Sequence, residues 1–418
     1  LSPSSAASDV YKRQIYLYAS AVRLAALFNK KASLMVAGHA EAFDKLKREI
    51  DSSAKYIWFH AASLGEFEQG RPLIEEIRKQ YPNYKILQTF FSPSGYEVRK
   101  NYKGADIVCY LPFDTPGNAH RFIRLVQPCM AFFVKYEFWK NYLVELNRNS
   151  IPVYSVSSIF RDDQIFFRWY GAGYRDVLKQ FTHLFVQNKN SVSLLEKIGV
   201  RNTTVVGDTR FDRVLEICRQ AKELPVVEQF KGKAVTLVAG SSWAPDEDIF
   251  IPYFNAQPEM KLIIAPHVID EGHIKEIIGK LNRTVVRYTQ ATSETIAQAD
   301  CLIIDCFGLL SSIYRYGEIA YIGGGFGVSI HNTLEAAVYG MPVIFGPNNK
   351  KFQEAQDLLA CKGGFEIQGA SDFNSLMDHF LADHTFLDKS GKKAGSYVED
   401  NAGALEKIMK EVPFSEKM

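Results

Sequence analysis

The chain has 418 residues, 47% of them apolar and 23% charged, so one hydrophobic core would be oversized and two domains are expected. Its 49 Lys and Arg residues against 47 Asp and Glu leave a formal net charge of +2, which excludes the overall basic field of a nucleic-acid-binding protein. The six cysteines are scattered without CxxC pairs or metal-like spacing, which favours reduced, buried thiols over disulfides or a zinc site.

The N-terminus contains two different segments. Residues 1–14 are rich in small polar side chains and lack the basic start of a signal peptide, so we interpret them as disordered or foreign to the native start. Residues 15–28 are nearly all apolar but shorter than the ~20 residues of a spanning helix. They predict a helix over residues 15–30 that lies on a membrane surface, with two lysines near anionic headgroups. A buried first helix of a soluble domain fits these residues equally well.

Short apolar strands alternate with helices over residues 31–218. This alternation predicts a parallel, doubly wound sheet. The expected strands lie in KYIWFHAAS, YKILQTFFS, ADIVCYLP, CMAFFVKYE, IPVYSVSS, HLFVQN and VRNTTVVGDTRFD. The polar stretch over residues 219–233 has no clear periodicity, and we expect it to be a linker.

The same alternation begins again over residues 234–400. Its expected strands lie in AVTLVAGSS, KLIIAPH, TVVRYT, CLIIDC, IAYIGGG and MPVIFGP. They end in Gly, Ser, Pro or His, residues that let the backbone approach a ligand at the carboxyl edge of a sheet. The predicted fold class is therefore α/β, with two Rossmann-like domains facing a cleft. A last helix within residues 401–418 is expected to pack on the first domain.

The motif HAASLGE, residues 60–66, stands at the end of the first expected strand. It places Glu66 near the N-terminus of the next helix. A carboxylate there can cap the helix, stabilised by the helix dipole. It can also be a general base, because doubly wound sheets bind ligands at their strand ends. Both interpretations stay open on this position alone.

A glycine cluster interrupts the second domain at residues 321–342, YIGGGFGVSIHNTLEAAVYGMP. Backbone N–H groups of the glycines and a helix that begins near Asn332 would suit one phosphate, and Glu335 would reach ribose hydroxyls. The spacing matches neither a Walker loop nor GxGxxG, so a nucleoside monophosphate group fits best. The alternative is a tight turn, but a turn needs fewer glycines. The glycines are Gly323, Gly324, Gly325 and Gly327.

The segment GDTRFD, residues 207–212, ends the first domain. Arg210 within it is a candidate for neutralising a leaving group. A surface ion pair of Arg210 with Asp208 or Asp212 is the interpretation that composition favours.

Together these segments resemble the Kdo transferases, which move 3-deoxy-D-manno-octulosonic acid (Kdo) from its CMP ester to the lipid A precursor. The resemblance runs from about Ile15 to the end of the second domain. It rests on HAASLGE, YEFW at residues 136–139, GDTRFD and the GGG…HNTLEAAVYGMPVIFGP block. It implies the GT-B arrangement of glycosyltransferases, CMP-Kdo as donor and lipid IVA as acceptor. It also implies a location on the cytoplasmic face of the bacterial inner membrane, with the apolar helix similar to the family's anchor.

The resemblance assigns three residues to catalysis. Glu66 matches the base that deprotonates the acceptor hydroxyl, which implies an inverting direct displacement. Glu137, in YEFW, matches a second acidic position that supports the transition state. Arg210 stands where the family usually has Lys in GNLKFD, so the charge is kept while the geometry differs.

The resemblance also assigns nucleotide contacts in the second domain. Pro266 and His267 match a Pro-Arg pair, and histidine lacks the permanent charge of arginine. The family segment that is often Met-Gly-Glu corresponds to Phe307, Gly308 and Leu309. The NxxE that binds ribose and phosphate corresponds to Asn332, Thr333, Leu334 and Glu335. Since Glu66 and the NxxE are retained, the departures indicate a divergent branch.

No metal or cofactor is expected, because a monophosphate leaving group develops less charge than a diphosphate. Residues 246–248, Asp-Glu-Asp, resemble a DxD metal motif, but an acidic helix start is preferred. Two other functions are weighed. A sugar-nucleotide 2-epimerase of the same architecture has no need of an apolar, lysine-flanked N-terminus. A non-catalytic nucleotide-binding protein has no need of Glu66.

Overall fold

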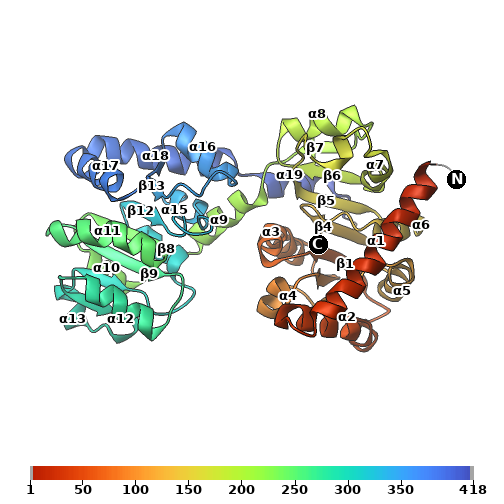
Figure 1. The fold of residues 1–418 in the computed structure, drawn as a ribbon, viewed down its shortest axis with the longest axis horizontal. Helices are drawn as coiled ribbons and strands as arrows, with labels where there is room; N and C mark the ends of the chain where they lie inside the picture. Colours follow the sequence, from red (N-terminus) through yellow and green to blue (C-terminus); the bar gives the residue numbers. More distant parts are fainter. Residues whose placement is uncertain (1–2, 415–418) are drawn as a thin grey trace. The chain divides into compact units, whose positions relative to one another are not determined.

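The computed structural model describes residues 3–414 and divides into two compact units (Figure 1). The first, here the first domain, contains the chain up to Asp212 and from Ala402 onward, and the second domain is Arg213–Asn401. Each contains one seven-stranded sheet whose neighbouring strands are all parallel. The predicted α/β class with two parallel sheets is therefore confirmed, while the predicted cleft stays a prediction.

The first sheet has the strand order β3-β2-β1-β4-β5-β6-β7. The chain runs from β1 outward to β3 and returns to β4 beside β1, so the order reverses between β1 and β4. Doubly wound sheets bind ligands at such a reversal, outside the carboxyl ends of the strands. The strands are β1 (Lys55–Ala61), β2 (Tyr84–Phe90), β3 (Ile107–Tyr110), β4 (Met130–Val134), β5 (Val153–Ser158), β6 (His183–Val186) and β7 (Thr203–Val205).

Helices cover both faces of the first sheet, and successive residues of β1 face opposite cores. Trp58 packs with Phe122 on one face, and Phe59 stacks on Phe132 on the other. Such two-sided burial explains why the strands are almost continuously apolar. The helices are α2 (Lys30–Glu49), α3 (Leu64–Gln80), α4 (Pro93–Arg99), α5 (Pro116–Val126), α6 (Lys140–Arg148), η1 (Ile165–Phe167), α7 (Ala172–Leu178), α8 (Lys189–Lys197) and α19 (Ala404–Glu411), and α9 (Thr209–Arg219) crosses the domain boundary.

The N-terminal helix α1 (Pro3–Ala25) extends further upstream than the sequence predicts. Residues 3–14 are helical, so the interpretation as disordered is wrong for them, whereas a foreign origin stays a prediction and residues 1–2 lie outside the described part. The predicted helix over residues 15–30 ends at Ala25, and α2 begins after a turn. Among the described residues, none of the helices combines the length and apolarity that crossing a membrane requires.

One side of α1 packs on the first domain and the other is exposed. Ala19 is buried with Met35 and Phe113, and Val22 packs against this cluster. The exposed apolar side chains are Val10, Tyr16, Leu17, Tyr18 and Leu24 on α1 and Leu27 and Phe28 in the turn after it, of which Phe28 is 88% exposed. The buried side agrees with the interpretation as a helix of a soluble domain, and a membrane contact of the exposed side stays a prediction.

The second sheet has the strand order β10-β11-β9-β8-β12-β13-β14, which reverses between β8 and β12. Its strands are β8 (Thr236–Ser242), β9 (Lys261–Pro266), β10 (Val285–Arg287), β11 (Cys301–Ile303), β12 (Ile319–Ile322), β13 (Val343–Phe345) and β14 (Gly364–Glu366). The helices are α10 (Pro225–Lys231), α11 (Ala244–Ala256), α12 (Glu271–Lys280), η2 (Tyr288–Gln290), α13 (Ser293–Gln298), α14 (Leu310–Ile313), η3 (Tyr314–Tyr316), α15 (Leu334–Ala337), α16 (Gln353–Cys361), α17 (Ala370–Ala382) and α18 (His384–Asp400).

The domain boundary differs from the predicted linker. It falls between Asp212 and Arg213, and the predicted linker contains α10, whose Val227 and Phe230 are buried. These two residues, three apart on a short helix, bury one face that the polar composition of the segment conceals.

The last helix, α19, belongs to the first domain as predicted, with residues 415–418 outside the described part. The Asp212 carboxylate accepts the N–H groups of Gly403 and Ala404, at 2.9 and 3.1 Å. A carboxylate that binds free N–H groups at the start of a helix stabilises that helix.

We therefore expect Asp212→Ala to lower the free energy of unfolding of the first domain by about 1 kcal/mol, because α19 loses its N-terminal acceptor. Hydrogen exchange of residues 404–411 measures this directly. Asp44→Ala, which removes only an exposed pair with Lys47, is the control and should change stability by less than about 0.5 kcal/mol. Equal protection of α19 in both variants would contradict the assignment.

Candidate active site

Glu66 caps α3 as the sequence suggests, and it uses a single carboxylate oxygen to do so. Its Oε2 accepts the N–H groups of Ala62 and Ser63 at 2.7 and 3.1 Å. Ser63 Oγ lies 3.5 Å from the Glu66 nitrogen, which completes a capping box. Since both bonds go to Oε2, the cap does not engage Oε1. The cap and the general base are therefore compatible roles for one side chain.

The environment of Glu66 raises its pKa to about 7. Burial is the largest cause, and repulsion from the Glu137 carboxylate is the second. The N–H bonds from Ala62 and Ser63 act in the opposite direction, as does the charge of Lys135. A carboxylate whose pKa lies near neutrality accepts a proton more readily than an ordinary glutamate, as a general base requires.

Glu137 follows β4, next to the point where the strand order reverses. It is buried, and its Oε2 lies 3.1 Å from His60 Nε2 and 2.5 Å from Trp139 Nε1. The strand ends of β1 and β4 thus bring together the two acidic residues that the sequence singles out, although 70 residues separate them in the chain.

His60 is a member of this site to which the sequence analysis assigns no role. Its side chain is fully buried and bridges Thr89 Oγ1, 2.9 Å away, and the Glu137 carboxylate. A histidine within an otherwise apolar central strand was the available signal, since a buried imidazole requires polar partners.

Arg210 pairs with Asp208 and not with Asp212, which caps α19. The guanidinium lies 2.9 Å from the Asp208 carboxylate, which is itself buried and also accepts from the amide groups of Gln69 and Gln187. The ion pair that composition favours is therefore present. A role of Arg210 toward a leaving group stays a prediction.

In the second domain, three rings meet at the carboxyl ends of β8, β9 and β12. Pro266 ends β9, and His267 after it stacks on Trp243 and on His331, with ring centroids 4.7 and 4.3 Å apart. Trp243 Nε1 donates to His331 Nε2 at 3.3 Å, so this imidazole is neutral. Burial, and secondarily His267, lowers the pKa of His331. The sequence indicates His267 alone of these three rings.

The glycine cluster has a packing role that the sequence does not reveal. A Cβ on Gly323 would clash with the Ser241 carbonyl, and one on Gly325 with the backbone of Gly346. The glycines thus let the loops after β12, β8 and β13 approach one another closely. The N–H groups of Gly323, Gly324 and Gly327 donate within the protein, so the expectation that all four glycines offer free donors is wrong.

The NxxE segment lies beside the glycine cluster. Asn332 Nδ2 donates to Glu335 Oε1 at 2.9 Å, and Asn332 Oδ1 accepts from the Leu334 N–H. Leu334 is a core residue, while the Thr333 hydroxyl is buried without a hydrogen-bond partner. The helix at this point, α15, has only four residues, which limits the dipole that the sequence suggests for phosphate binding.

The third predicted nucleotide segment follows β11. Phe307 is exposed, Gly308 adopts a left-handed conformation with a φ of 86°, and Leu309 is half-buried. The side chain of Phe307 therefore offers an apolar surface at the same edge of the sheet as His267.

The Asp-Glu-Asp segment is the start of α11, as preferred from the sequence. Asp246 accepts the N–H groups of Trp243 and Gly324, both at 2.9 Å, and the Tyr321 hydroxyl at 3.0 Å. Glu247 binds Ser242 and His273, and Asp248 pairs with Lys280. Within residues 3–414, no group of three or more His, Cys, Asp or Glu side chains is arranged to hold a metal ion.

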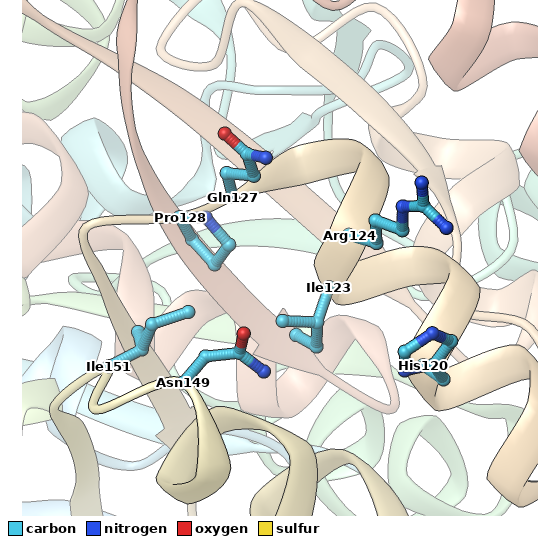
Figure 2. Close-up of a pocket in the computed structure, with 7 residues that line it drawn as sticks. All are labelled: His120, Ile123, Arg124, Gln127, Pro128, Asn149 and Ile151. Carbon is cyan, nitrogen blue, oxygen red and sulfur yellow. The ribbon is translucent and has the colours of Figure 1, made fainter.

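The first domain also contains a pocket (Figure 2). The segments that line it lead into β4 and β5, so it opens at the amino edge of the sheet, opposite to Glu66 and Glu137. Its lining residues are His120, Ile123, Arg124, Gln127, Pro128, Asn149 and Ile151.

Comparison with known proteins shows which family the chain resembles. The family model described as 3-deoxy-D-manno-octulosonic-acid transferase (kdotransferase) matches residues 37–213, most of the first domain. Over these residues the first domain is similar to the Kdo transferases. A 3-deoxy-D-manno-octulosonic acid transferase of Aquifex aeolicus is 26% identical over 84% of this chain and 94% of the relative. One of Haemophilus influenzae is 24% identical over 84% and 85%. The chain is accordingly a glycosyltransferase.

Solved structures show the same fold at low sequence identity. UDP-GlcNAc 2-epimerase from Neisseria meningitidis, bound to UDP-GlcNAc, has a TM-score of 0.59 and 14% identity, covering 85% of this chain and 98% of its own. Acinetobacter baumannii MurG has a TM-score of 0.54 and 10% identity, covering 85% and 98%. At these identities the similarity establishes the fold alone, so it does not favour the epimerase.

We expect transfer activity to rise with pH through about 7, because only ionised Glu66 accepts a proton. Glu137→Gln removes the repulsion that raises the Glu66 pKa, so the rise should move to lower pH. The pH dependence of the rate at saturating substrate measures both. Glu145→Gln, a buried carboxylate bound to Arg148, is the matched control and should leave the midpoint in place. A midpoint that Glu137→Gln does not move would show that the two carboxylates are not coupled.

Proposed function

We propose that this chain transfers Kdo from CMP-Kdo to a hydroxyl of the lipid A precursor, as a step of lipopolysaccharide core synthesis. The observation that carries the proposal is the pair of carboxylates at the ends of β1 and β4, half-buried Glu66 and buried Glu137, within a domain that matches the Kdo transferase family model. The raised pKa of Glu66 suits the removal of a proton from a sugar hydroxyl.

In the proposed reaction, the acceptor oxygen forms a bond to the anomeric carbon of Kdo as the bond from that carbon to the CMP phosphate breaks. CMP leaves with the electron pair, and the acceptor proton passes to Glu66. A single direct displacement of this kind inverts the anomeric centre. Glu137 stabilises positive charge that develops on the sugar ring in the transition state.

The second domain is proposed to bind the donor. Its ring cluster, Trp243, His267 and His331, lies at the carboxyl edge of the sheet with the Asn332–Glu335 segment. Asn332 and Glu335 would bind the ribose and phosphate, and a protonated His267 would supply the charge that arginine supplies in the motif it resembles. The leaving group carries one phosphate, so we propose that transfer needs neither metal nor cofactor.

The lipid product tests the proposed function. CMP-Kdo and lipid IVA are incubated with the enzyme in excess chelator, and the mass of the lipid product is measured by mass spectrometry. We expect the mass of added Kdo with the natural chain and none with Glu66→Gln, because an amide keeps the cap but accepts no proton. CMP should bind both proteins equally in calorimetry.

Glu76→Gln, a carboxylate further along α3, is the control for that assay and should retain activity. Activity of Glu66→Gln within a few-fold of the natural chain would remove Glu66 from the role of base. Conversion of a UDP-sugar to its 2-epimer without transfer to lipid would favour the epimerase instead.

We further propose that the first domain rests on the inner surface of the bacterial inner membrane. Leu24, Leu27 and Phe28 are 65%, 71% and 88% exposed at the end of α1 and in the turn after it. Lys30 and Lys31 follow at the start of α2, where they would meet anionic headgroups. A lipid acceptor requires that the site be held near its bilayer, and such a short apolar surface with flanking cations binds in the interface without crossing it.

Replacing Leu24, Leu27 and Phe28 together by Ser should release the protein from anionic vesicles, because the inserted apolar area is lost. Co-sedimentation measures it, and transfer to detergent-dispersed acceptor should be unchanged. Val98→Ser, an exposed apolar residue on α4, serves as the matched control. A triple variant that sediments like the natural chain would place the membrane contact elsewhere.

A further inference from the structure

We propose that His60 is a positioning residue that orients Glu137, and thereby holds its carboxylate beside Glu66. The inference rests on the proposed function, in which Glu66 is the general base. It makes the pKa of that base depend on His60, a buried residue that has no access to substrate. It assigns a role to the histidine of HAASLGE through contacts that the sequence does not show.

The position of His60 on β1 explains its contacts. His60 and Trp58 are two residues apart, so they point to the same face of the sheet. In the parallel register His60 lies beside Thr89 of β2, and Thr89 Oγ1 is 2.8 Å from Trp58 Nε1 and 2.9 Å from His60 Nδ1. On the other side, His60 Nε2 lies 3.1 Å from Glu137 Oε2. All four side chains are buried.

Two tryptophans fix the direction of their own hydrogen bonds in this chain of contacts. An indole N–H only donates, so Trp139 makes Glu137 Oε2 an acceptor, and Trp58 makes Thr89 Oγ1 an acceptor. The Thr89 hydroxyl can give its own proton to His60 Nδ1 at 2.9 Å or to the Phe59 carbonyl at 3.2 Å. We assign this proton to the nearer acceptor, Nδ1, which leaves the His60 proton on Nε2 as a donor to Glu137.

This arrangement holds the Glu137 carboxylate in one orientation. Two N–H donors converge on one oxygen of this buried carboxylate. Without the His60 donor, the carboxylate is free to turn away from Glu66. The repulsion that raises the pKa of Glu66 is then reduced, and that pKa falls.

The other charged groups near these residues do not replace that effect. Lys135, the residue that follows β4, lowers the pKa of Glu66, which is opposite to the effect of Glu137. His39, on α2, has a pKa lowered to about 4 by burial, with His60 as a minor cause, so it is neutral where the enzyme works. Glu137 is thus the acidic neighbour through which His60 acts on Glu66.

The experiment compares His60→Phe, which removes both ring nitrogens, with His60→Gln, whose amide can replace the Nε2 donor. We expect His60→Phe to move the Glu66 midpoint down from about 7 by about half a pH unit or more, and His60→Gln to restore it. NMR of glutamate labelled with ¹³C at the side-chain carboxyl follows the midpoint without substrate, and the pH–rate profile should move in parallel. Adding Glu137→Gln to His60→Phe should give a smaller shift than Glu137→Gln gives in the natural chain. His39→Gln is the matched control.

Nitrogen NMR of the natural protein tests the proton position by itself, even where His60→Phe does not fold. We expect the Nε2–H form of His60 at neutral pH, and a proton on Nδ1 would overturn the proposal. A loss of activity in His60→Phe with an unmoved Glu66 midpoint would also overturn it, since that pattern indicates a purely structural histidine. These readouts are separate from the lipid product, whose absence in the natural chain would reject the proposed function alone.

Discussion

The site depends on the repulsion between two carboxylates that the first sheet brings to the ends of neighbouring strands. Glu66 and Glu137 follow β1 and β4, which adjoin because the strand order reverses between them. Burial, and after it the charge of Glu137, raises the pKa of Glu66 to about 7. Glu66 binds two backbone N–H groups with one oxygen, and Glu137 binds His60 and Trp139. The result is one acid that titrates near neutrality beside a carboxylate that His60 and Trp139 hold in place.

The second domain has a different arrangement at the carboxyl edge of its sheet. Loops after β8, β12 and β13 approach one another so closely that Gly323 and Gly325 have no room for a Cβ. This close packing places His331 in contact with Trp243 and His267, which follow two adjacent strands. The edge therefore presents flat rings beside the Asn332–Glu335 segment, where we propose that the donor binds.

Sequence periodicity was sufficient for the overall architecture, because two-sided burial makes parallel strands recognisable as apolar runs. Both sheets, the return of α19 and the acidic start of α11 were predictable in this way. The boundary was not, since α10 buries only Val227 and Phe230 and resembles a polar linker. The N-terminal helix was ambiguous for a related reason. Ala19 faces the domain while Leu17 faces outward, and composition cannot separate two faces of one helix.

The sequence by itself determined which residues are candidates for the chemistry, because HAASLGE, YEFW and the NxxE segment name Glu66, Glu137, Asn332 and Glu335. Only the tertiary structure decided their surroundings. The contacts of His60 depend on Thr89 of the neighbouring strand, and the pKa of Glu66 depends on burial and on a carboxylate 71 residues away. Hydrogen-bond direction and electrostatic repulsion depend on distance in space, and the register of a parallel sheet sets that distance.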